Sequence, residues 1–249
     1  MDNPLYSLIA ACLLAAIYAI LGRAGRAEGA ERFWAHRRWV SAAAGVSVAY
    51  VFIDVLPELA AQNRALREAM GGIELRFAEQ RVYVLVLLSF VVMYGLEHMV
   101  LASRERRRAF IAGGERDAVY WLHLGGFAAY SALIGYLLSE RAERGAASLA
   151  VYTLAMAVHF VIVNHSLSEE HSGAYRGHGH WWLAGSVIVG WALGALVPIS
   201  EVAFARLFAL LAGGVVITSL NAELPGDRAA RFWPFCMGAV VFALLLLMA

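Results

Sequence analysis

The chain has 249 residues, of which 61% are hydrophobic and 16% are charged. A soluble globular domain contains about 45–50% apolar and about 25% charged residues, so this composition argues against a soluble fold. The formal net charge of +1 gives no case for nucleic acid as a partner.

Apolar segments follow one another along the chain and are separated by short loops that contain arginine. Each segment has about 20 residues, which in a helix is long enough to cross a hydrocarbon core of roughly 30 Å. Helices are expected because lipid does not tolerate an open sheet edge. The sequence predicts an all-α fold, a polytopic membrane helix bundle of about eight transmembrane helices forming one domain over residues 1–249. The expected spans are residues 4–22, 39–61, 81–103, 118–138, 148–167, 181–199, 203–222 and 231–249.

The distribution of basic residues predicts how this bundle is oriented. The chain contains arginine but no lysine, and most of its 20 basic residues fall in the odd-numbered loops. Basic loops favour the cytoplasmic side of a membrane, so both termini are expected outside. The chain is compact and carries no sorting signal, which favours a bacterial inner membrane.

Ionisable side chains inside the spans are the strongest functional signal. Each costs roughly 2.5–3.5 kcal/mol on insertion, so such residues usually face a partner or a pathway. They gather in spans two to five, which predicts a shared polar centre that could hold a divalent metal ion. The candidate transport or metal residues are Asp54, Glu97, His98, His123 and His159.

Spacing limits which of these side chains can act together. Asp54 and Glu58 are four residues apart and share a helix face, unless Pro57 breaks the helix between them. Glu97 and His98 are adjacent, so they point about 100° apart and are poorly placed to bind one ion.

A second, histidine-rich group begins at the end of span five and continues into the loop that follows. His165 and Glu169 have the i, i+4 spacing that suits a divalent metal ion, and His171, His178 and His180 follow within a short stretch. Imidazole and carboxylate are ordinary zinc ligands, so these five residues are candidates for metal binding in a flexible loop. A solvated polar loop is the alternative interpretation.

Residues 45–58 and 214–225 resemble one another, since each is an apolar helix that ends in an acidic Leu-Pro turn. In the expected topology the two helices run in opposite directions. Inverted repeats of this kind are common in secondary transporters, so the pair favours transport. Chance similarity between two apolar helices is the competing explanation.

Several segments resemble the ZIP family of divalent-metal transporters. Residues 54–58 (Asp-Val-Leu-Pro-Glu) look like the end of the family's second span, and residues 96–102 (Leu-Glu-His-Met-Val-Leu-Ala) look like the end of its third. Residues 212–238 look like its last two spans. The resemblance implies eight spans, with both termini outside, and transport of a divalent metal ion such as zinc.

The metal motifs of that family are only partly present. Its fourth span carries His-x-x-x-acid-Gly, but Tyr130 and Ile134 occupy the two ligand positions here. Its fifth span carries His-x-x-x-Glu, of which His159 is retained and Val163 replaces the glutamate. The resemblance therefore implies a mid-membrane site in which His159 is the surviving ligand.

Three functions are consistent with these observations. The first is zinc-type metal transport through an altered site, with the metal ion as substrate and the lipid bilayer as partner. The second is a non-transporting ZIP-like protein that acts as a regulator or partner subunit. The third is a membrane-embedded metal hydrolase or another protein that uses intramembrane histidines, such as a haem protein. We expect no enzyme activity and no organic cofactor, and a homodimer would be ordinary for such a fold.

Overall fold

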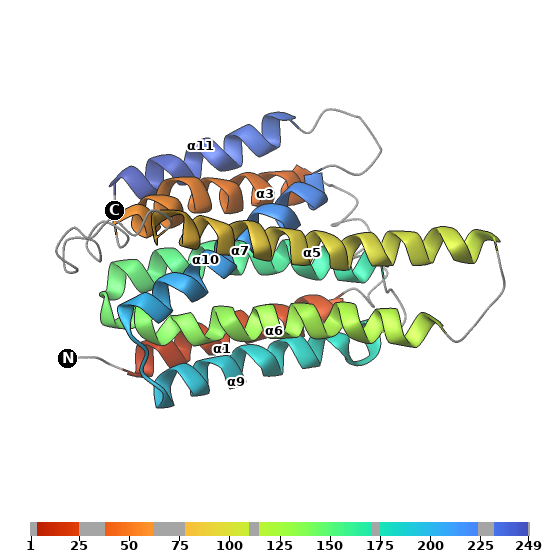
Figure 1. Cartoon of the computed structure of the whole chain (residues 1–249), viewed down its shortest axis with the longest axis horizontal. Coiled ribbons are helices and arrows are strands. Elements are labelled where there is room, and N and C mark those ends of the chain that lie inside the picture. Colours follow the sequence, from red (N-terminus) through yellow and green to blue (C-terminus); the bar gives the residue numbers. More distant parts are fainter. Residues whose placement is uncertain are drawn as a thin grey trace.

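The computed structural model describes residues 4–24, 38–61, 78–109, 115–170, 175–223 and 232–248. These residues are helical apart from two short turns, and they form one bundle of long, roughly parallel or antiparallel helices (Figure 1). The elements are α1 (Pro4–Ala24), α3 (Arg38–Tyr50), the π-helical turn η1 (Val51–Val55), α5 (Ala78–Ala109), α6 (Glu115–Glu143), α7 (Ala146–Glu170), the π-helical turn η2 (Tyr175–Gly179), α9 (His180–Leu196), α10 (Glu201–Glu223) and α11 (Phe232–Met248).

Within the residues that the structure describes, six helical segments are long and apolar enough to cross a membrane, which supports the expected helical membrane bundle and an integral membrane protein. They are Pro4–Arg23, Arg38–Ala61, Val82–Ser103, Ala118–Glu143, Ala146–Ser168 and Glu201–Asn221. The other two expected spans coincide with α9 and α11, which have 17 residues each. At 1.5 Å per residue they are about 25 Å long, so eight complete crossings stay a prediction.

The helices pack in two groups. The first group consists of α1, α6, α7 and α9, and the second consists of α3, α5, α10 and α11. In Figure 1, α3, α5 and α11 lie above α1, α6 and α9. The boundary between the groups is formed by α3, α5 and α10 on one side and by α6 and α7 on the other.

Two glycines allow equivalent helix pairs to approach closely within the second group. A Cβ added to Gly45 of α3 would collide with the carbonyl of Phe235 in α11. A Cβ added to Gly213 of α10 would collide with the carbonyl of Val86 in α5. Aligning the two Leu-Pro pairs of the sequence places Gly45 on Gly213, the residue just before the second similar segment, and the two glycines make similar close contacts.

We expect Gly213→Ala to destabilise the folded protein by about 1–3 kcal/mol, because the added methyl group overpacks the α5–α10 contact. Gly185→Ala is the matched control, since a Cβ at Gly185 meets nothing within 4 Å. Thermal unfolding of both variants in detergent measures the difference. Equal melting temperatures for the two variants would show that the close approach is unimportant.

One end of the bundle carries exposed tryptophans. The rings of Trp121 in α6 and Trp182 in α9 lie 6.2 Å apart and are both exposed, and the guanidinium of Arg23 lies 4.7 Å from the centre of the Trp181 ring. Tryptophan concentrates where membrane and water meet. The aromatic residues at this end are therefore consistent with a place near a membrane surface.

Candidate polar sites of the bundle

A π-helical turn keeps the first two acidic candidates on one face. Proline lacks an N–H group, so Pro57 cannot continue a regular α-helical ladder. The chain widens instead into η1, where the N–H of Leu56 donates to the carbonyl of Val51, and the helix then continues to Ala61. Pro57 therefore does not break the helix, and Asp54 and Glu58 reach the same arginine.

That arginine belongs to a network of five charged side chains, called the arginine cluster below. Arg141 of α6 lies 2.7 Å from the Glu58 carboxylate and 3.4 Å from that of Asp54. Arg144, in the turn after α6, lies 2.6 Å from the other Glu58 oxygen and 2.9 Å from Glu201 of α10. The cluster joins the end of α6 to the second helix group, and Asp54 is therefore engaged by an arginine.

Arg141 is buried, with 4% of its surface exposed. Its guanidinium carbon lies 4.3 Å from the centre of the Phe208 ring and 5.7 Å from that of Tyr152, and Nη1 donates to the Ser148 hydroxyl at 3.2 Å. Aromatic faces attract a cation, but a buried charge chiefly needs its carboxylate partners. Arg141 is thus held by three elements besides its own.

His159 of α7 lies in the core of the bundle, with no exposed surface. Within the part of the chain that the structure describes, neither ring nitrogen has a hydrogen-bond partner. Its ring lies 5.8 Å from that of Tyr130 in α6, whose hydroxyl donates to the Leu211 carbonyl in α10 at 3.0 Å. A buried polar group without a partner is uncommon and calls for an explanation, such as a bound ion.

The other positions of the two metal motifs are also buried. Ile134 follows Tyr130 by one helical turn, and Val163 follows His159 in the same way. Ile134 has no exposed surface and Val163 has 1%. The three side chains that replace ligands are therefore aromatic, at Tyr130, or aliphatic, at Ile134 and Val163.

Glu97 and His123 form a second buried pair that bridges the two helix groups. His123 Nε2 of α6 lies 3.8 Å from Glu97 Oε1 of α5, and both side chains are buried. His98 points elsewhere: it is exposed and its ring stacks on that of Tyr94, 6.1 Å away. Glu97 and His98 therefore face different surroundings, one buried and one exposed.

The five predicted transport residues therefore do not gather in one place. Asp54 belongs to the arginine cluster, Glu97 pairs with His123 of α6, and neither nitrogen of His159 bonds to any of these residues. Among the described residues, no three His, Cys, Asp or Glu side chains are placed to hold a metal ion together.

The histidine-rich group, which begins near the end of α7, is described only in part. His165 is half-buried in α7, and His178 is exposed in η2. The side chain of Glu169 and the whole of His171 lie outside the described residues. What the structure describes of this group is thus a half-buried His165 in α7, an exposed His178 in η2 and a buried His180.

His180 differs from the expected loop residue, since it begins α9 and is fully buried. Its Nδ1 lies 3.3 Å from the carbonyl of Tyr175, so the ring packs back on η2. The Tyr175 hydroxyl donates to Asn164 of α7 at 2.9 Å, and burial raises the pKa of Tyr175 above its usual value. These contacts tie η2 to the bundle and make His180 a packing residue.

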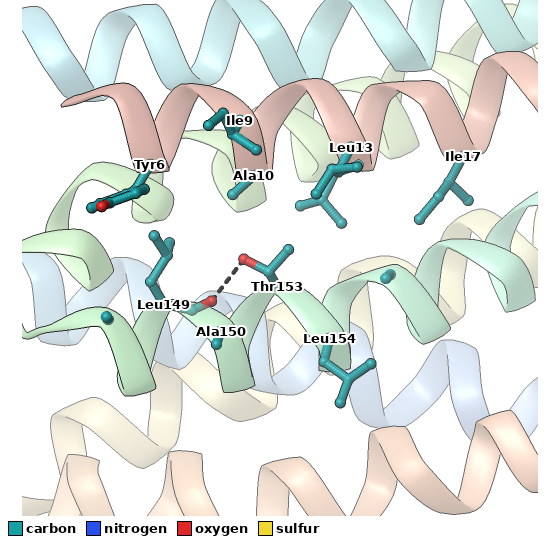
Figure 2. A pocket seen from close by; sticks show the side chains of 12 residues that line it. Tyr6, Ile9, Ala10, Leu13, Ile17, Leu149, Ala150, Thr153 and Leu154 are labelled. Carbon is teal, nitrogen blue, oxygen red and sulfur yellow. Dashed lines mark hydrogen bonds between the residues drawn. The ribbon is translucent and has the colours of Figure 1, made fainter. Parts of the chain in front are cut away.

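An apolar groove of about 530 Å³ opens between α1 and α7 (Figure 2). Tyr6, Ile9 and Leu13 line it from α1, and the Thr153 hydroxyl in its wall donates to its own helix at Leu149. None of the predicted site residues lines this groove, and its walls suit hydrocarbon better than an ion.

The chain was also compared with known proteins. No protein-family model matches it, and no curated protein or solved structure matches it. The functional argument therefore depends on the geometry of the bundle and on the chemistry of its buried polar groups.

Proposed function

We propose that this chain is a ZIP-like secondary transporter that carries a zinc-type divalent metal ion past His159. The observation that carries this proposal is the buried imidazole of His159, whose two nitrogens have no partner among the described residues. A neutral imidazole is an ordinary ligand for zinc and similar ions. His159 packs against Tyr130, which in turn bonds to α10, so the imidazole lies near the boundary between the two helix groups.

The architecture supports transport. Arg144 contacts both Glu58, near the end of the helix that begins at α3, and Glu201, at the start of α10. These two helices therefore run antiparallel, and their equivalent glycines Gly45 and Gly213 make equivalent close contacts. An inverted repeat with polar groups near its interface is a common design of secondary transporters.

The ZIP-like part of the proposal is supported by one contact. The resemblance assigns the metal motifs to residues 130–135 and 159–163, and the rings of Tyr130 and His159 are neighbours in the structure. Because Tyr130, Ile134 and Val163 replace ligands, the ion is held by fewer protein groups than in the family. Such a site binds its ion weakly and relies on ligands that the ion keeps, such as water.

Uptake of zinc or cadmium into proteoliposomes tests the proposal. We expect wild-type protein to move the ion and His159→Ala to lose at least about nine-tenths of that activity, since removal of a metal ligand or its support commonly costs 10–100-fold. His98→Ala is the matched control, because His98 is an exposed histidine outside the core. Equal uptake by wild type and His159→Ala would contradict the proposal.

A non-transporting ZIP-like protein is the second candidate, and the buried Ile134 and Val163 favour it. Aliphatic side chains at two ligand positions make the core drier than a transport path needs. In the same assay this protein would fold and reconstitute, yet wild type would show no uptake. A hydrolase is less well supported, because it needs three metal ligands at one place.

A further inference from the structure

The arginine cluster connects the two helix groups at one end of the bundle. Arg141 of α6 and Arg144, in the turn after it, belong to the first group, whereas Glu58 and Glu201 belong to the second. The longest of its four ion-pair distances is 3.4 Å. The Glu97–His123 pair also bridges the groups, but its atoms are 3.8 Å apart. The arginine cluster is thus the tighter of these two polar bridges.

Aromatic rings pack directly against this cluster. The Tyr50 hydroxyl accepts a hydrogen bond from Arg141 at 3.5 Å, and the Tyr50 ring packs edge-on against Tyr152 of α7 at 6.3 Å. Phe208 of α10 lies under the Arg141 guanidinium. Charged pairs and buried rings from both groups therefore close the boundary at the same level.

We propose that the arginine cluster is an ionic lock that holds the two helix groups together at this end. Its opening admits water and cargo from that side to the level of Tyr50 and beyond. This inference rests on the proposed transport function, because only a transporter needs the boundary to open. The lock supplies the closed state of one of the two gates that alternating access requires.

The burial of the charges explains how such a lock can work. Arg144 and Glu201 are partly exposed, with side-chain exposures of 27% and 75%, so water can replace their contact at small cost. Arg141 is buried, and separating it from Glu58 and Asp54 is expensive. The exposed Arg144–Glu201 pair therefore breaks and forms again readily. The ion pairs of the buried Arg141 keep the two helix groups together in the resting state.

Cysteine labelling tests the lock without measuring transport. The chain has two native cysteines, Cys12 and Cys236, which are replaced by alanine. A single reporter is then introduced as Ser47→Cys; Ser47 is buried, and its hydroxyl has no hydrogen-bond partner among the described residues. Three residues before Tyr50, it lies on the same helix face and deeper than the cluster. Protein in nanodiscs is treated with a charged methanethiosulfonate reagent.

We expect Arg144→Glu to raise the labelling rate of the reporter about tenfold, because it places a third carboxylate beside Glu58 and Glu201. Adding Glu201→Arg restores the opposite charges and returns the rate toward that of the parent. Arg206→Glu is the control, since Arg206 is an exposed arginine of α10. If Arg144→Glu fails to fold, Arg144→Gln gives a smaller increase in the same direction.

An unchanged rate in the folded Arg144 variant, or an equal increase in Arg206→Glu, would overturn the lock. Labelling needs no metal ion, so the lock and the cargo are tested separately. A faster rate without zinc uptake would leave the lock standing and remove the proposed cargo. Zinc uptake with an unchanged labelling rate would support the proposed cargo and contradict the lock.

Discussion

Arg141→Met is expected to lower the free energy of unfolding by about 1–3 kcal/mol, because Asp54 loses its arginine and Glu58 keeps only Arg144. Arg141 is 4% exposed and bonds to both Asp54 and Glu58. Methionine preserves most of the volume against the Phe208 ring, so the loss reports the charge and not a cavity. Urea or thermal unfolding in detergent measures the change.

Removing the carboxylates together with the arginine should recover most of the lost stability. Replacing a whole buried ionic group by neutral side chains of similar volume is often neutral or stabilising. We therefore expect Arg141→Met with Asp54→Asn and Glu58→Gln to be more stable than Arg141→Met alone. Arg206→Met, at an exposed arginine, controls for loss of positive charge. Additive losses in the combined variant would show that these residues do not act as a unit.

The helical bundle could be predicted because hydrocarbon thickness dictates the length of an apolar segment, and each expected span coincides with a helix. The likeness between residues 45–58 and 214–225 stays a prediction; just before the second segment, Gly213 makes a close helix contact of the same kind as Gly45. A repeated glycine is informative because close helix packing depends on it. The length of the apolar segments did not predict which face of each helix packs against its neighbours.

Arg141 was missed for a physical reason. The expected fourth span ends at residue 138, because an arginine normally marks the loop beyond a span, whereas α6 continues to Glu143. The additional helical turn buries Arg141 against α3 and α10. Two acidic residues in the second span were the available signal, since carboxylates in a membrane call for a cation, and Arg141 and Arg144 follow at the same membrane end.

The histidines show the same limit. Their positions within apolar segments predicted that His98, His123 and His159 lie at membrane depth. These positions did not predict which helix face each histidine occupies. The structure exposes His98, pairs His123 with Glu97, and buries His159 beside Tyr130. Adjacent residues on a helix face different neighbours, so only the packing of the bundle separates a core histidine from a surface one.

Restoring the family's ligands around His159 is expected to create a strong metal site. The variant Tyr130→His, Ile134→Asp and Val163→Glu provides four ligands in all, with the i, i+4 spacing that places each pair on one helix face. Residues 130, 134 and 163 belong to one buried core cluster, His159 is also buried, and the rings of residues 130 and 159 are already neighbours. A neutral imidazole alone cannot balance a divalent charge, but two carboxylates with two imidazoles can.

We expect zinc to bind this triple variant at least about 100-fold more tightly than wild type and to raise its free energy of unfolding by about 2.7 kcal/mol at 100 times the dissociation constant. Without metal the variant should be less stable than wild type, because it buries two unpaired carboxyl groups. Thermal unfolding with and without zinc measures both effects. His159→Ala in the triple variant is the control and should remove most of the zinc-dependent gain. A triple variant that zinc does not stabilise would show that residues 130, 134, 159 and 163 do not converge on one ion, and the ZIP-like assignment of the core would fall with it.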